Sequence, residues 1–218
     1  TAMWEQEAAL LREAGLLPSK GCPEAGTIAV RADRDQRTRA TGEAILEGLA
    51  PGCGFKPVVN EKAQPDPLFH PLEVGYCTLD PAVVRDEIPV GTIEGLEQSL
   101  SAPIGELAAI LGPASPEFCR RHQLPEGCTA MDVPTRLTLA KDNRTVHLDG
   151  KLGAASSAAE IMLLEYGQWD HPAGWGAVDK AALQRLLPVH SKVFDAVNRA
   201  PSVAAGRGSE LLLDMANA

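Results

Sequence analysis

The chain has 218 residues, enough for one large domain or two small ones, with a core that needs no disulfide in order to fold. Charged residues make up 22% and hydrophobic residues 44%, which are ordinary globular values and exclude a disordered or fibrous protein. The net charge is −9, so the sequence predicts no nucleic-acid partner, and any anion must be held by a local basic cluster. No apolar run approaches the roughly 20 residues of a bilayer span, so no membrane partner is predicted either.

A strand between two helices is predicted in the first fifty residues. Apolar positions across residues 3–17 fit one face of a helix. Residues 27–32 predict a short buried strand, and the charged segment 33–39 then opens a helix that ends at Leu49. This order places polar side chains at the carboxyl end of a sheet, where α/β proteins bind ligands.

Proline shapes the middle of the chain. Prolines recur through residues 51–91, and we expect a long irregular excursion there. Residues 91–112 have helical spacing, with a kink expected at Pro103. Ser115 followed by Pro116 is typical of a capped helix start.

The last third predicts a hairpin followed by helices. Residues 137–148 alternate as two strands around a turn, and residues 154–166 suggest a buried helix with Glu160 at its middle. We expect Pro201 to end the helix before it and Ser209 to cap a final one.

The helix over residues 179–199 has the clearest pattern, and Pro188 should bend it. His190 lies on its apolar stripe, so this side chain is either hydrogen-bonded in the core or directed into a site. Periodicity alone favours the core.

The cysteines lie outside metal-site spacing, because none forms C-x-x-C and no histidine stands at zinc-site distance from them. Neighbouring Pro and Gly residues place several of the cysteines in loops, where disulfide bridges are common. The alternative is that all five are reduced thiols in the core. Two bridges would leave one cysteine as a free thiol or bonded to another chain or segment. The five are Cys22, Cys53, Cys77, Cys119 and Cys128.

Arg37 follows the predicted strand 27–32 within the charged segment. A guanidinium stays charged and presents a planar fork that matches phosphate oxygens, and a helix N-terminus adds its dipole. The alternative is a solvated first helical turn of mixed charge.

Several motifs occur in order along most of the chain and resemble the bacterial periplasmic phytases of the histidine acid phosphatase family. The related glucose-1-phosphatases share the layout, but residues 37–53 are closer to phytase. The motifs are KGCP at 20–23, ADRDQRTRATGEA at 32–44, GLAPGC at 48–53, PDPLFHPL at 65–72, AEIMLL at 159–164, GWG at 174–176 and LLPVH at 186–190.

The resemblance implies an α/β fold, helix-rich overall: a histidine-phosphatase core portion with a largely helical insert domain. Residues 1–50 would be core, 51–135 an irregular and helical insert, and 136–218 a hairpin and helices that return to the core. The family signature R-H-G-x-R-x-P and the later His-Asp pair are absent from this sequence. We therefore expect a middle segment, truncated relative to the family, with an open sheet edge beside residues 28–30 that favours homo-oligomers.

The resemblance also assigns site residues. Arg37 and, less closely, Arg207 match phosphate-binding arginines, and Asp33 and Glu160 match residues of the substrate pocket. The resemblance assigns no role to His190, which, if directed into the site, would contact the pocket residues and not the substrate. No catalytic residue of the family falls within the chain, and no metal or cofactor is implied.

The cysteines match two family disulfides, Cys22 with Cys53 and Cys119 with Cys128. Cys77 matches a cysteine whose family partner lies beyond this sequence. The implied parent is a periplasmic or secreted acid phosphatase that hydrolyses phytate or a sugar phosphate through a phosphohistidine. Two alternatives remain open: a non-catalytic, oligomeric binding module, and a cytosolic anion-binding protein with reduced cysteines.

Overall fold

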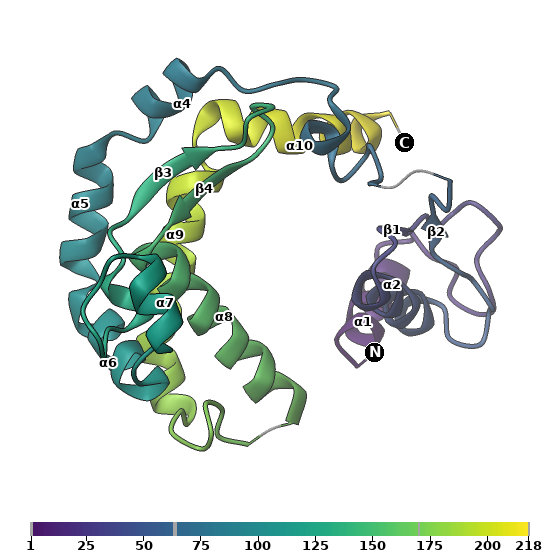
Figure 1. Cartoon of the computed structure of the whole chain (residues 1–218). Coiled ribbons are helices and arrows are strands. Elements are labelled where there is room, and N and C mark those ends of the chain that lie inside the picture. The colour runs from purple at the N-terminus through teal and green to yellow at the C-terminus, as the bar shows by residue number, and fades with distance from the viewer. Residues whose placement is uncertain (1, 63–64, 170, 218) are drawn as a thin grey trace. The chain divides into compact units, whose positions relative to one another are not determined.

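The computed structural model describes residues 2–62, 65–169 and 171–217, and the chain divides into two compact units, Thr1–Val74 and Gly75–Ala218 (Figure 1). The boundary between them differs from the segment boundaries expected after residues 50 and 135. Pro71 and Leu72 are buried, and His70 contacts Asp33, so residues 65–74 pack within the first unit.

The first unit is built around a small apolar cluster of Ala8, Leu17 and Leu49, with Trp4 packed against it. The helices that supply the cluster, α1 and α2, pack against each other. The elements of this unit are α1 (Ala2–Glu13), β1 (Arg31–Ala32), α2 (Gln36–Leu49), β2 (Val58–Val59) and α3 (Pro71–Val74).

The strand predicted over residues 27–32 is wrong in length, because β1 covers only Arg31–Ala32. It pairs in parallel with β2, which is equally short, in the register Arg31↔Val58 and Ala32↔Val59. A strand extends only as far as a neighbour can accept its hydrogen bonds. The polar loop after β1 nevertheless leads directly into α2, as the sequence predicts.

The second unit is helix-rich and contains one antiparallel hairpin. Helices α8 and α9 pack along each other, and α9 buries Leu183, Leu186, Val193 and Val197 as the periodicity predicts. Val189 is buried in addition, whereas Phe194, which the same periodicity places on the apolar stripe, is exposed. Its elements are α4 (Pro81–Glu87), α5 (Val90–Ser99), α6 (Ser101–Leu111), α7 (Pro116–Arg121), a 3₁₀ turn (Ala130–Asp132), β3 (Arg136–Leu139), β4 (Val146–Asp149), α8 (Lys151–Trp169), α9 (Lys180–Asn198) and α10 (Pro201–Ala216).

Two of the predicted helices differ from expectation. The predicted helix 91–112 is two helices separated at Leu100, and Pro103 lies in the first turn of α6, where its missing N–H leaves no helical bond unmade. The last helix begins at Pro201 and not at Ser209. Pro201 both ends one helix and begins the next, since its fixed φ suits the first helical turn.

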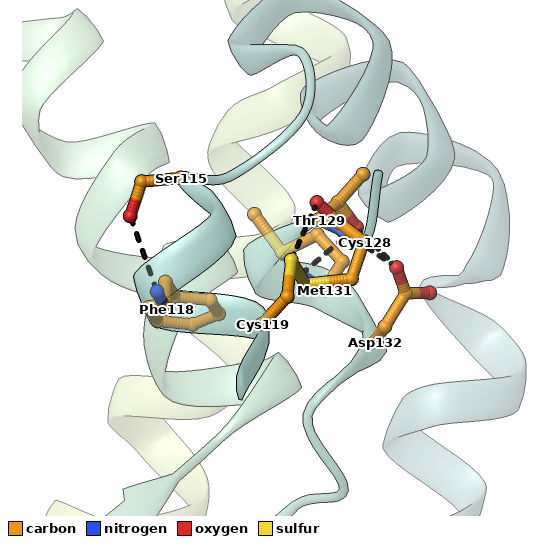
Figure 2. Close-up of a disulfide and its surroundings, with 7 residues drawn as sticks. All are labelled: Ser115, Phe118, Cys119, Cys128, Thr129, Met131 and Asp132. Carbon is orange, nitrogen blue, oxygen red and sulfur yellow. Dashed lines mark hydrogen bonds between the residues drawn. A yellow bond between two sulfur atoms is a disulfide. The ribbon is translucent and has the colours of Figure 1, made fainter. Parts of the chain in front are cut away.

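Both predicted disulfides are present, Cys22–Cys53 and Cys119–Cys128, and Cys77 is free and exposed. Figure 2 shows the second disulfide beside the capped start of α7, where the hydroxyl of Ser115 accepts a hydrogen bond from the amide of Phe118 at 3.2 Å. Among the described helices, none combines the length and apolarity needed to cross a membrane.

Candidate functional site

An open pocket of about 530 Å³ lies in the first unit at the carboxyl end of β1, and Asp33, Arg37 and His70 line it. The Arg37 side chain is 80% exposed, and its Nη1 lies 2.7 Å from Oδ2 of Asp35. An ion pair this exposed contributes little stability, so the guanidinium can exchange Asp35 for a bound anion at small cost.

Hydrogen bonds fix both carboxylate oxygens of Asp33. Oδ1 accepts the amide proton of Arg34 at 2.7 Å, and Oδ2 lies 2.7 Å from Nε2 of His70. The Thr38 hydroxyl donates to the Asp33 carbonyl at 2.7 Å, which ties the loop to the first turn of α2. Partial burial raises the pKa of Asp33, but the bonds from His70 and Arg34 outweigh burial and hold the pKa below its ordinary value.

His70 has carboxylates on both sides of its ring. Its Nδ1 lies 3.2 Å from Oε1 of Glu73, and its Nε2 faces Asp33. Partial burial lowers the pKa of His70, yet the bond to Asp33 and the charge of Glu73 outweigh it and raise the pKa above its ordinary value. The imidazolium form therefore persists to higher pH than in an unperturbed histidine.

Sequence reasoning placed Asp33 and Arg37 in a pocket but missed His70. The histidine occurs in the PDPLFHPL motif, 37 residues after Asp33, and no periodicity connects the two. Its position depends on a turn that the buried Asp66 makes, because the Asp66 carbonyl accepts the amide proton of His70 at 2.8 Å. A histidine within a proline-bounded loop was the available signal.

In the second unit, Glu160 and His190 lie next to each other on α8 and α9. Oε2 of Glu160 is 3.9 Å from Nδ1 of His190, and the Ser156 hydroxyl is 3.2 Å from the same nitrogen. A serine–histidine–carboxylate relay needs one partner on each ring nitrogen, so this cluster does not activate a nucleophile. His190 is partly buried and hydrogen-bonded. Glu160 lies on the exposed side of α8, which is buried at Ala155, Ala159 and Met162.

Arg207 lies on α10 and hydrogen-bonds the side-chain oxygen of Asn198. It lines an open pocket of about 540 Å³ in the second unit, together with Ser156 and Phe194. Phe194 also neighbours His190, with ring centroids 5.9 Å apart. Ser156 and Phe194 therefore contact His190 and also line the pocket of Arg207.

The predicted residues thus lie in both units: Asp33 and Arg37 line one pocket in the first unit, and in the second unit Glu160 neighbours His190 while Arg207 lines a separate pocket. In the described part of the chain, no cluster of three or more His, Cys, Asp or Glu side chains has an arrangement that could hold a metal ion.

No family model matches the chain, but similar proteins are known. It is 38% identical over 205 residues to phytase AppA of Escherichia coli, covering 91% of this chain and 47% of that protein. It is 25% identical over 208 residues to glucose-1-phosphatase of Salmonella typhimurium, again covering 91% of this chain and 47% of that protein.

Solved phytases share the fold. A Hafnia alvei phytase in complex with tartrate superposes with a TM-score of 0.83 at 35% identity, covering 99% of this chain and 53% of that one. A Citrobacter braakii phytase superposes with a TM-score of 0.80 at 33% identity, covering 97% and 54%. The chain is therefore related, over nearly all of its length, to phytase-like histidine acid phosphatases, and it spans about half the length of the relatives it matches.

Proposed function

We propose that this chain is the part of a phytase-like acid phosphomonoesterase that holds the phosphate ester. The complete protein would hydrolyse phosphate monoesters through a phosphohistidine supplied by a segment outside these residues. In the first unit, Arg37 binds a phosphoryl group and Asp33 lines the same pocket. In the second unit, Arg207 binds phosphate and Glu160 contacts the substrate, with His190 supporting Glu160.

The observation that carries the proposal is the exposed Arg37 guanidinium, which lines an open pocket at the end of a strand in a chain 38% identical to a phytase. Covalent phosphoryl transfer also needs an in-line nucleophile and an acid for the leaving oxygen. The R-H-G-x-R-x-P motif and the His-Asp pair that would supply them are absent from this sequence. These residues alone therefore bind the ester without turnover.

Two narrower alternatives have support. The similarity to a glucose-1-phosphatase favours sugar phosphates as a second substrate class. The missing nucleophile favours a non-catalytic binding module, oligomeric through the edge of β1 that β2 does not occupy. We infer a periplasmic or secreted location, because two disulfides are typical of an oxidising compartment.

The test uses protein expressed from the complete coding sequence, assayed at acidic pH with phytate and with glucose 1-phosphate. We expect Arg37→Ala to lower kcat/KM by about a hundredfold, since one guanidinium both positions and neutralises the phosphoryl group. The matched control is Arg199→Ala. Arg199 is 79% exposed, pairs with Asp195 at 3.0 Å, and lies outside both pockets described above.

Equal kinetics for the Arg37 and Arg199 variants would contradict the phosphate-binding role. Absence of turnover in the complete protein, together with binding of phytate, would favour the non-catalytic module.

A further inference from the structure

The cluster of Asp33, His70 and Glu73 joins two segments that are far apart in the sequence. Asp33 follows β1, whereas His70 and Glu73 flank and occupy the short α3. The His70 side chain is 33% exposed and lines the same pocket as Arg37. The proposed function assigns no role to His70.

The two contacts of His70 depend on its protonation. A neutral imidazole carries one N–H and can donate to one carboxylate only, whereas an imidazolium donates to both. The distances of 2.7 Å to Asp33 and 3.2 Å to Glu73 fit the doubly protonated ring. Loss of the proton therefore breaks one contact and leaves a carboxylate facing a lone pair.

The charges around His70 come from three elements: the segment β1 to α2, the turn before α3, and α3 itself. The charged side chains that line the pocket are Arg31, Asp33, Arg37 and His70. Their net charge is +2 when His70 is protonated and +1 when it is neutral. Four further carboxylates surround the pocket. Asp35 pairs with Arg37, Glu61 with Arg34 and Glu73 with His70, and Asp66 is buried in the turn before α3.

We propose that His70 is a positioning residue of the phosphate pocket, which in its imidazolium form holds Asp33 and leaves Arg37 available to an anion. Asp33 is the carboxylate best able to compete for Arg37, because it lines the same pocket and Arg37 lies close enough to stabilise its charge. When His70 loses its proton, the pocket loses one positive charge, and the neutral ring can keep its bond to Asp33 only by giving up its bond to Glu73. The inference rests on the proposed function and adds a pH dependence to it.

The raised pKa of His70 agrees with this direction, because the imidazolium persists above the ordinary value of 6.5. A dianion about 6 Å from one unit charge in a water-like dielectric changes its affinity by about tenfold when that charge is lost. Anion binding should therefore be strong below the pKa of His70 and about tenfold weaker above it.

Sulfate is the probe for the test, because it stays a tetrahedral dianion across the whole range, so its own titration cannot mimic that of His70. We measure its dissociation constant calorimetrically from pH 5 to pH 9 with the 218-residue chain. The ring resonances of His70, identified by their loss in His70→Gln, report its protonation with and without saturating sulfate. We expect sulfate to raise the His70 pKa, since binding and protonation are linked.

His70→Gln keeps a donor near the position of Nε2 and removes the charge, so we expect affinity to be about tenfold lower at pH 5 and flat with pH. Glu73→Gln keeps the histidine but removes one carboxylate, so the fall in affinity should move to lower pH. His171→Gln is the matched control, because His171 is an exposed histidine whose ring bonds the Pro172 carbonyl. It should reproduce the unsubstituted profile.

A pH profile of unsubstituted protein that parallels His70→Gln would overturn the proposal, as would an absence of sulfate binding at pH 5. If His70→Gln does not fold, Glu73→Gln provides the test. The pH at which sulfate affinity falls should be lower in Glu73→Gln than in the unsubstituted protein, and an equal pH would contradict the proposal.

Hydrolysis by the complete protein is scored separately. Turnover with a flat sulfate profile would refute only the role of His70. A sulfate profile linked to His70 without turnover would refute only the phosphatase activity.

Discussion

Removal of the Cys22–Cys53 disulfide should cost the first unit most of its stability. The two cysteines are 31 residues apart, and loop-closure entropy for a loop of that length is worth about 3.7 kcal/mol at 25 °C. The described residues of the unit bury few large apolar side chains: Leu17, Leu46, Leu49 and Leu72. Small domains have stabilities of about 5 kcal/mol, so most of the free energy of unfolding would be lost.

Trp4 offers a local probe, because it packs against the apolar cluster of Ala8, Leu17 and Leu49, whereas Trp169 and Trp175 are 62% and 85% exposed. In a Trp169→Phe/Trp175→Phe background, urea unfolding followed by fluorescence reports the first unit. With an m-value of about 1 kcal/mol per M, the urea midpoint of the Cys22→Ala/Cys53→Ala variant should fall by about 3.7 M.

The matched control is Cys119→Ala/Cys128→Ala, which opens a loop with a separation of only 9 residues in the other unit. Its Trp4 transition should stay in place. A midpoint change below about 1 M in the Cys22/Cys53 variant would refute the view that this bridge supplies most of the stability of the unit.

Three further results are expected. Gly153→Ala should destabilise the second unit by about 3 kcal/mol in thermal unfolding, because a Cβ there would overlap the Leu148 carbonyl. Gly167→Ala in the same helix is the control, because its Cβ meets open space, and it should stabilise the unit by up to about 1 kcal/mol. Ser115→Ala should cost about 1 kcal/mol in urea unfolding through loss of the α7 cap, and an unchanged midpoint would contradict that. His70, with its raised pKa, stabilises the first unit fully below pH 6.5 and loses this contribution as pH rises through the folded value. Asp33, with its lowered pKa, contributes above pH 3.8 and loses this contribution as pH falls through its folded value. The melting-temperature difference between unsubstituted protein and His70→Gln should therefore be largest near pH 5, and a constant difference up to pH 9 would contradict the coupling.

The secondary structure was most predictable where side-chain spacing is a local property. The amphipathic helix α9 and the hairpin of β3 and β4 lie close to their predicted ranges, because period and turn residues specify them directly. The helix break at Leu100 was not predictable, because the apolar spacing continues across it. Local sequence rules place a kink at Pro103, which in fact lies in the first turn of α6.

The sequence by itself pointed to Arg37 and Asp33 as candidate site residues, to the motifs that resemble phytases, and to the loop settings of Cys22 and Cys53, whereas Cys119 is buried in α7. Only the tertiary structure brought His70 to Asp33 and left Glu160 on the exposed side of α8. The reason is physical: spacing along a strand or helix follows from local backbone geometry, whereas a contact across 37 residues depends on how a proline-bounded turn packs.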